Sequence, residues 1–427
     1  MPKSDSKSDT IQKTRYTTVL ALGAVIVVLA ATSAGARVRY IIIDLGTVPG
    51  YPTARAWSIN NNGQVVGHCE DVNYISRAVL FDTSGEVNNI DLGTLGGEGA
   101  EALSINNNGQ IVGAALDNND NYQATIFDFN GTGNNIKVSK EGFALSINDN
   151  DQIVGVEVNS SGYEVATIFD RHDANNNIEL GTLDGFMNSQ AYSVNNNGRI
   201  VGFAYNDLFS GLRAVLFDPN YQGNNIDLGT LGGQYSAAIS INDNGQIVGR
   251  AETSDGSTHA VLFDPNGTGN NVDLGTLSGC NFFVAASINN QGQIVGQASI
   301  DAFSTFRAVL FDPTGCGNNI DLNGLVDPAL GWTLKTARCV NDNGWIAGWG
   351  TNPDGYSHSF LLRPCKPGDA EPDADVDFDD FAVFASAWKS KDGDINWNAC
   401  CDISCPEDGV VDEWDLSVFC TNWLTRQ

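Results

Sequence analysis

The sequence predicts an all-β fold, a seven-bladed β-propeller closed by its N-terminal strand, with a small α-helical domain after it. Three observations predict this. Strings of the form Ser-Ile-Asn-x-Asn-Gly-Gln-Ile-Val-Gly recur seven times, with four short strand-like runs in each repeat. A fourth-strand string also stands ahead of the first repeat, at Ile43–Thr47. Two acidic stretches, each followed by an amphipathic helical pattern, end the chain.

The repeat length is that of a propeller blade. The glycine that ends each Ile-Val-Gly string is Gly67, Gly113, Gly155, Gly202, Gly249, Gly296 or Gly348, at spacings of 46, 42, 47, 47, 47 and 52. A period near 47 exceeds one coil of a β-solenoid and fits four strands. The strands are expected at the Ala-x-Ser-Ile-Asn, Gln-Ile-Val-Gly, Ala-Val-Leu-Phe-Asp and Asn-Asn-Ile-Asp-Leu-Gly-Thr strings.

The ends of the repeat region predict how the ring closes. The last unit stops after its third strand, near residues 359–362, and the missing fourth strand matches Ile43–Thr47. Pairing these segments would remove both open sheet edges, which otherwise promote aggregation. The alternative is an open superhelical stack. The propeller is expected over residues 38–365.

The asparagine clusters are predicted to be hairpin corners. In Ser104–Gly113 the Asn108-Gly109 pair would supply the positive φ angles of a tight turn, and Asp151 replaces the glycine in another unit. These hairpins share one face of the ring and vary little. The loops of the opposite face vary in length and sequence, which favours that face for binding.

Composition and charge limit the kinds of partner and the cellular location expected for the protein. The 427-residue chain is 42% hydrophobic and carries a formal charge of −29, which argues against nucleic acid and anionic membranes as partners. Residues 1–36 combine basic residues, an apolar run and Ala34-Gly35-Ala36, the pattern of a cleaved signal peptide. The alternative is an uncleaved anchor. We expect a secreted, extracellular or cell-surface protein with no membrane span after cleavage. Export makes the nine cysteines candidates for disulfides.

The variable loops carry aromatic side chains that suit carbohydrate or protein ligands. The candidates for the ligand face are Tyr235, Phe283, Trp332 and Tyr356. The alternative is that these rings pack beneath their own loops.

No catalytic constellation is recognised. The four histidines occupy different places in their units, and the recurring aspartate of Asp-Leu-Gly-Thr is expected to bond a neighbouring turn. Glycosidase carboxylate pairs are distant in sequence, so a polysaccharide-active hydrolase or lyase on the variable-loop face is the alternative function.

The C-terminal segment, residues 368–427, predicts about two calcium ions. Val376, Asp377, Asp380 and Trp388 match Val411, Asp412, Asp415 and Trp423 at a distance of 35 residues. Oxygen ligands at alternate positions, followed by a carboxylate that starts a helix, are typical of a calcium loop. The first set would be Asp369, Glu371, Asp373, Asp375, Asp377 and Asp380. The second would be Asp402, Ser404, Asp408, Val410, Asp412 and Asp415.

Two resemblances extend this interpretation. The repeat strings, with Thr258–Phe263 and Ser357–Leu361, resemble the HAF repeats of bacterial extracellular proteins, which implies an exported, propeller-like protein without a common activity. The paired loop-helix units resemble a type I dockerin, which implies calcium and a cohesin-like or other cell-surface partner. Ala374 in place of glycine, a lengthened second loop and extra cysteines depart from that pattern.

Together these observations predict a secreted, non-catalytic binding or display protein. A propeller would bind carbohydrate or protein, and a calcium-dependent tail would attach it. The alternative for the tail is a calcium-folded domain without a partner.

Overall fold

The computed structural model describes residues 40–206, 211–301, 304–364, 368, 376, 378–391, 393–396, 401–403 and 409–422. The predicted signal peptide, residues 1–36, lies outside them. Within the described part, no helix has the length and apolar character needed to cross a membrane. The described residues are mostly β-strand, with two α-helices near the C-terminus.

The strands form antiparallel sheets in sequence order. The first sheet consists of β2 (Thr53–Ile59), β3 (Val65–Glu70), β4 (Ser76–Phe81) and β5 (Ile90–Asp91). The second consists of β6 (Gly96–Ile105), β7 (Ile111–Asp117), β8 (Tyr122–Phe127) and β9 (Ile136–Lys137). The third consists of β10 (Gly142–Ile147), β11 (Ile153–Val158), β12 (Glu164–Phe169) and β13 (Ile178–Gly181). The fourth consists of β14 (Asn188–Val194), β15 (Ile200–Tyr205), β16 (Leu212–Leu216) and β17 (Ile226–Asp227).

The next sheet is double. One half consists of β18 (Gly232–Ile241), β19 (Ile247–Thr253), β20 (Thr258–Phe263) and β21 (Val272–Asp273). The other half consists of β22 (Phe282–Ile288), β23 (Ile294–Asp301), β24 (Ser304–Phe311) and β25 (Ile320–Asp321). A single parallel pair, Thr258 with Phe282, joins the halves. Short 3-10 helices are η1 (Ala174–Asn176), η3 (Leu322–Leu325) and η4 (Pro328–Leu330).

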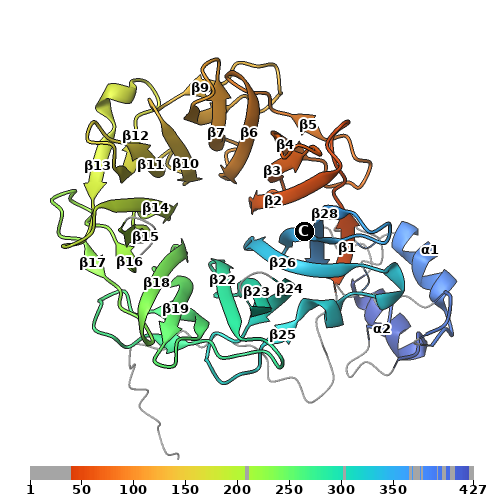
Figure 1. The fold of residues 1–427 in the computed structure, drawn as a ribbon. Helices are drawn as coiled ribbons and strands as arrows, with labels where there is room; N and C mark the ends of the chain where they lie inside the picture. The colour runs from red at the N-terminus through yellow and green to blue at the C-terminus, as the bar shows by residue number, and fades with distance from the viewer. Residues whose placement is uncertain are drawn as a thin grey trace, which may run out of the picture. The chain divides into compact units, whose positions relative to one another are not determined.

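The last sheet joins the two ends of the repeat region. It consists of β26 (Thr333–Val340), β27 (Ile346–Thr351), β28 (Ser357–Pro364) and the N-terminal β1 (Tyr40–Asp44). As the sequence predicts, β1 pairs antiparallel with β28, from Tyr40–Pro364 to Asp44–Phe360. The sheets surround a common centre with β2, β6, β10, β14, β18, β22 and β26 innermost, which is a β-propeller (Figure 1).

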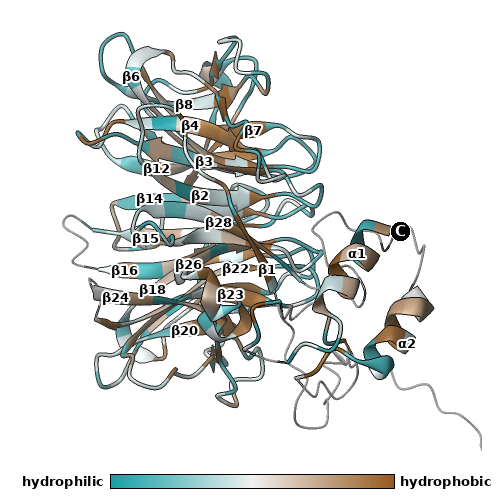
Figure 2. Ribbon diagram, turned by 90° about the vertical axis from the view of Figure 1, so that its right-hand side faces the viewer, coloured by the Kyte–Doolittle hydropathy of each residue, from teal (hydrophilic) through white to brown (hydrophobic). Residues whose placement is uncertain are grey.

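Hydrophobic side chains fill the space between successive sheets. In one such layer Val66 and Ala78 of the first sheet pack with Leu92, Ala100 and Ile111. Figure 2 shows the strands in side view, with many of the hydrophilic residues in the connecting loops. The cores therefore form between units as well as within them, so no unit buries its apolar face alone.

A β-bulge recurs in every innermost strand. It explains the extra residue in the Ala-x-Ser string and the glycine that ends each Ile-Val-Gly string. The pairing register shifts across the Ala-x-Ser string, as between Ala56 and Ser58, so the middle residue is an insertion. Opposite the bulge, a Cβ on the repeat glycine Gly67 would collide with the carbonyl oxygen of Arg55, and the equivalent glycines face the same obstacle. Glycine is required there because the two backbones approach closely.

The asparagine clusters are hairpin corners, as predicted, but their turn geometry differs from the prediction. Gly109 has a φ of 80° and Asp151 a φ of 64°, whereas Asn108 is not among the residues with positive φ. Gly109 N donates to Asn106 O at 3.1 Å, and the Asn106 side-chain oxygen accepts from the backbone N of Asn108 and Gln110. One positive-φ residue is sufficient because the asparagine side chain closes the rest of the turn.

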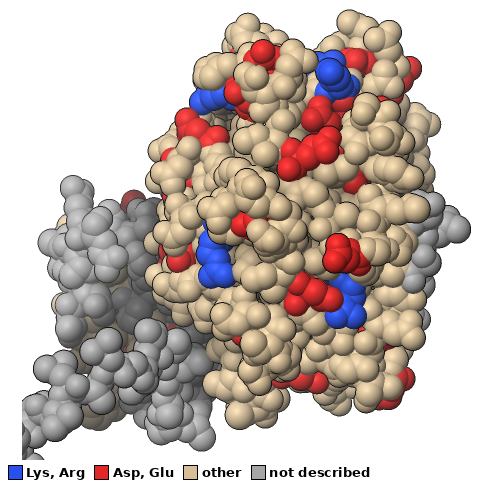
Figure 3. All heavy atoms as spheres, turned by 90° about the vertical axis from the view of Figure 1, so that its left-hand side faces the viewer, with Lys and Arg blue, Asp and Glu red and all other residues tan. Residues whose placement is uncertain are grey.

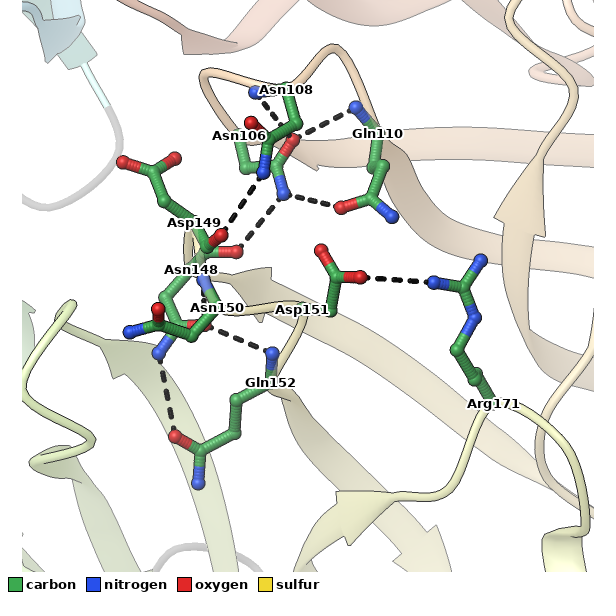
Figure 4. A network of polar contacts seen from close by, with 9 residues as sticks. All are labelled: Asn106, Asn108, Gln110, Asn148, Asp149, Asn150, Asp151, Gln152 and Arg171. Carbon is green, nitrogen blue, oxygen red and sulfur yellow. Dashed lines mark hydrogen bonds and ion pairs between the residues drawn. The ribbon is translucent and has the colours of Figure 1, made fainter.

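The same asparagines also bind successive units together (Figure 4). Asn106 Nδ2 donates to Gln110 Oε1 and to Asn148 O, so its amide uses both donors and both acceptor positions. The inter-unit bond recurs seven times and returns to its start: Asn60, Asn106, Asn148, Asn195, Asn242, Asn289 and Asn341 each donate to the next, over 2.8–3.0 Å. The circuit closes where Asn341 donates to Asn60 O.

A second set of asparagines joins the units at the periphery. Asn89 Nδ2 donates to Leu45 O and Thr47 O, and Asn135, Asn225, Asn271 and Asn319 repeat this contact with the preceding unit. The expectation that the aspartate of Asp-Leu-Gly-Thr bonds a neighbouring turn is wrong. Asp91 Oδ1 accepts from Gly93 N in its own turn, at 2.8 Å. The carboxylate closes its local turn, and the asparagine makes the long-range contact.

The C-terminal helices are α1 (Phe378–Ala387) and α2 (Glu413–Asn422), and the carboxylates expected to start them, Asp380 and Asp415, lie in their first turns. Phe384 and Phe419, which are 35 residues apart, are each 1% exposed and their rings lie 5.0 Å apart. Lys389 N donates to Val411 O at 2.8 Å, and Val411 N donates to Ser390 O at 3.0 Å. The two loop-helix units therefore share one small core.

Replacing Asn148 by alanine is expected to lower the free energy of unfolding of the propeller by about 1–3 kcal/mol, because the variant loses a fully bonded buried amide and its bond to the Asn195 carbonyl, which keeps the local donor Gly198 N. Urea titration followed by tryptophan fluorescence measures the change. Asn130→Ala, in an exposed loop, is the control and is expected to change stability little. Equal stabilities for the two variants would contradict the circuit's role.

The ring closure predicts a pH dependence. Burial raises the pKa of Asp44, but hydrogen bonds from His358, Gly46 and Asn352 outweigh it and lower that pKa below the ordinary 3.8. Ionised Asp44 therefore stabilises the closed ring above its ordinary pKa, and this stability is lost as the pH falls through the lowered value. Thermal melts between about pH 5 and pH 3 should show a smaller loss of stability in Asp44→Asn than in the unaltered protein. Asp120→Asn, in an exposed turn, should behave like the unaltered protein. Parallel curves for Asp44→Asn and the unaltered protein would oppose this account.

Candidate functional site

The asparagine circuit surrounds a polar hollow at the centre of the hairpin face. Its empty volume is about 600 Å³, lined by the Ile or Val and the first two polar residues of each hairpin. The second of those polar residues forms its own circuit, from Asn61 N donating to Asn107 Oδ1 through to Asp342 N donating to Asn61 Oδ1. The sequence predicts these positions only as turns, and nothing in it indicates the hollow.

Amides and carboxylates alternate around this second circuit. The order is Asn61, Asn107, Asp149, Asn196, Asp243, Asn290 and Asp342. Each carboxylate accepts from the amides beside it: Asp243 Oδ2, for example, receives Asn196 Nδ2 and Asn290 Nδ2 at 3.1 Å. Seven positions do not permit perfect alternation, and the two like neighbours are amides, Asn61 and Asn107. Two adjacent carboxylates would repel each other.

The four predicted ligand-face aromatics have different environments. Phe283 is fully buried and packs in the core beside His259, so it offers no surface to a ligand, and its assignment to the ligand face was wrong. Trp332 is half-buried against Phe360, with ring centroids 6.2 Å apart. Tyr356 is 56% exposed and stacks on His358. Tyr235 is exposed, at 38%, and lies beside a hollow.

Tyr235 lies between two neighbouring hollows that share it and Leu212. The larger has an empty volume of about 580 Å³ and is also lined by Ser236, Arg250, Ala251, Glu252 and Thr258. The smaller, of about 430 Å³, adds Phe186, Gly211, Arg213, Asp227 and Gln234. An aromatic face bordered by a guanidinium, a carboxylate and an amide offers both stacking and hydrogen bonds to a small polar ligand.

Three of the four histidines make structural contacts within the sheets. His259 Nδ1 lies 2.8 Å from Asp273, and His358 Nδ1 lies 2.9 Å from Asp44. Trp57 Nε1 donates to His68 Nδ1 at 2.9 Å, and His68 Nε2 lies 3.5 Å from Glu70. Each of these three imidazoles therefore contacts another side chain of its own sheet, and none of the three lines the hollows beside Tyr235.

Most of the predicted calcium ligands fall outside the described residues: Asp369, Glu371, Asp373, Asp375, Asp377, Ser404 and Asp408. Asp380, Asp402, Val410, Asp412 and Asp415 are described. Within this part of the chain, no three His, Cys, Asp or Glu side chains form a group that could hold a metal ion. The complete ligand sets therefore remain predictions.

The described residues of the second loop nevertheless fit a cation site. Asp402 Oδ2 accepts from Gly409 N at 2.9 Å, and Gly409 has a φ of 76°, as a sharp loop turn requires. Asp415 accepts from Ile403 N and Asp412 N, at 2.8 and 2.7 Å. Asp380 and Asp415 are fully buried in the first turns of α1 and α2, 35 residues apart. Buried carboxylates at matched positions suit a divalent cation.

The described cysteines are all thiols: Cys69, Cys280, Cys316, Cys339, Cys401 and Cys420. Burial raises the pKa of the Cys69, Cys339 and Cys401 thiols to about 12, which makes them unreactive at neutral pH. Cys365, Cys400 and Cys405 lie outside the described residues. The disulfides that export would permit are therefore not formed among these six.

No protein-family model matches the chain, and no curated protein sequence matches it. Among solved structures, it is similar to TolB from Acinetobacter baumannii, at 12% identity over 70% of this chain and 65% of TolB, with a TM-score of 0.41. A gluconolactonase from Xanthomonas campestris is 9% identical, over 60% of this chain and 82% of the gluconolactonase, with a TM-score of 0.36. Streptogramin B lyase is 11% identical, over 76% of this chain and 98% of the lyase, with a TM-score of 0.28. The chain thus spans less than two thirds of that TolB, and these low scores carry no information on function.

Proposed function

We propose that the chain is an exported, non-catalytic binding protein, in which a seven-bladed propeller of HAF-like repeats presents a carbohydrate or protein ligand surface. A dockerin-like, calcium-dependent tail attaches it to a cohesin-like or other cell-surface protein. The closed circuit of seven asparagines supports the blade number. The N-terminal sequence supports export.

The observation that carries the binding role is the pair of hollows around Tyr235 on the variable-loop face. Tyr235 presents an exposed ring, and Glu252 and Arg250 border the larger hollow. Sugars are commonly held by one aromatic face and a few polar groups, and this arrangement provides both. Glu252 Oε2 accepts from Gln234 N at 2.6 Å, so this carboxylate is fixed by the loop beside the tyrosine. Carbohydrate is therefore the first ligand class to test.

The attachment role rests on the tail. Phe378 and Trp414 are 72% and 73% exposed, and a mainly apolar hollow of about 540 Å³ is lined by Phe378, Phe381, Phe419 and Cys420. Exposed apolar side chains of this size in so small a unit favour an interaction surface. Calcium would hold the two acidic loops, through Asp380 and Asp415 among others, and so fix the helices that carry this surface.

Tyr235→Ala is expected to weaken glycan capture by the mature protein about tenfold, because the stacking face is removed. A glycan array identifies the ligand, and titration calorimetry measures the change. Tyr221→Ala is the matched control: Tyr221 has a similar exposure, 40%, but belongs to a hairpin of the opposite face. Equal affinity of the two variants, or no captured glycan, would remove carbohydrate from the proposal.

Chelation of calcium is expected to unfold the tail and to leave the propeller folded. In calorimetry the transition of the tail should move to higher temperature as free calcium rises, because the ion binds only the folded loops. Asp415→Ala should reduce this shift, whereas Asp394→Ala, in the exposed linker, should not. A transition that is independent of calcium in the unaltered protein would contradict the calcium assignment.

A further inference from the structure

Arg338 reaches across the centre of the propeller. It occupies the bulge position of β26, where the Ala-x-Ser string inserts an extra residue. Its guanidinium lies 4.6 Å from the Trp57 ring of β2 and 6.0 Å from the Tyr192 ring of β14. Trp57 and Tyr192 occupy the same bulge position in their own strands. Strands β2 and β14 lie on different sides of the centre of the ring (Figure 1). A side chain that approaches rings from both strands therefore reaches into the centre.

The surroundings of Arg338 are aromatic and basic. Trp57 contacts Trp349 at 5.9 Å between ring centroids, and Tyr192 contacts Phe203 at 5.8 Å. Arg250 lies near Tyr192: burial lowers the pKa of its guanidinium, and the Tyr192 phenol partly opposes this. We name Arg250, Arg338, Trp57 and Tyr192 the axial cluster. All four are half-buried, so their surfaces remain accessible to solvent.

Within the described part of the chain, the two guanidiniums of the axial cluster have no carboxylate within ion-pair distance. Among the described residues, neither Arg250 nor Arg338 forms an ion pair, whereas other arginines do: Arg213 and Arg307 lie 2.8 and 3.6 Å from Asp227 and Asp321. Arg338 Nε is a buried donor without a hydrogen-bond partner in the described part of the chain. Because buried donors are almost always paired, Arg338 Nε can donate to an acceptor that a ligand supplies.

The unpaired positive charge of the axial cluster differs from the mixed charges on the outer surface. The whole chain carries a formal net charge of −29. On the outer side that Figure 3 shows, the Lys and Arg side chains are dispersed among Asp and Glu side chains. Uncompensated positive charge inside an acidic protein is costly unless an anion accompanies it. A guanidinium stacked on aromatic rings keeps its in-plane N–H donors free, and these match the two oxygens of a carboxylate.

We propose that the axial cluster binds a small ring-bearing carboxylate, with Arg338 holding the carboxylate, Arg250 adding positive charge near Tyr192, and the Trp57 and Tyr192 side chains bordering the ligand ring. A sugar acid and an aromatic acid share this chemistry. The site is distinct from the surface ring of Tyr235, although Arg250 lines the hollow beside that tyrosine.

The test is calorimetry of the mature protein with galacturonate, benzoate and galactose. Galacturonate or benzoate should bind with one site per chain, and galactose should not bind there. Stronger binding of galacturonate assigns the site to sugar acids, and stronger binding of benzoate assigns it to aromatic acids. Binding of neither acid, or equal binding of galactose and galacturonate, would overturn the proposal.

The variants identify the residues. Arg338→Met should weaken binding of the preferred acid by about ten- to a hundredfold, as expected for the loss of a charged hydrogen bond. Arg307→Met, which removes the same charge from an ion pair elsewhere, should retain the original affinity. Arg338→Lys keeps the charge but loses the planar guanidinium, so its affinity for the acid should be intermediate. This variant also tests the proposal if Arg338→Met does not fold. Unaltered affinity in Arg338→Lys and Arg338→Met would overturn the assignment, whereas Tyr235→Ala tests the glycan surface separately.

Discussion

The hydrogen bond from one hairpin asparagine to the carbonyl of the next is the interaction on which the propeller depends. It is buried, it satisfies an amide completely, and it recurs until Asn341 returns to Asn60. An apolar interface alone would tolerate sliding between sheets, but a directional bond at every junction fixes their relative position. The β1–β28 pairing then completes a ring that the asparagines already define.

Local features of this fold could be predicted from the sequence because neighbouring residues decide them. The Asn106–Gly109 corner, the strand runs and the missing fourth strand of the last unit all depend on short strings. The inter-unit bonds could not be predicted, because Asn106 and Asn148 become neighbours only after the ring forms. The sequence also cannot distinguish Phe283 from Tyr235, because it predicts both as loop aromatics. Tertiary packing buries Phe283 and leaves Tyr235 exposed.

The candidate sites differ in how much the sequence reveals. The predicted calcium loops carry a sequence signal because their carboxylates recur at fixed spacing, and the burial of Asp380 and Asp415 follows the same 35-residue repeat. The axial cluster gave no such signal. Arg338 is one variable residue in an Ala-x-Ser string, and only the β-bulge reveals that this position points inward. The bulge position recurs in each of the seven innermost strands and can vary without altering the repeat.

The central claim is that the asparagine circuit makes the propeller one closed cooperative unit. Native-state hydrogen exchange, measured by mass spectrometry on peptides from each innermost strand, tests it most directly. A closed ring predicts that β2, β10 and β26 are protected by the same free energy and lose protection together as urea is added. Protection that falls progressively from the central units toward β2 and β26 would show an open stack instead, and would contradict the claim.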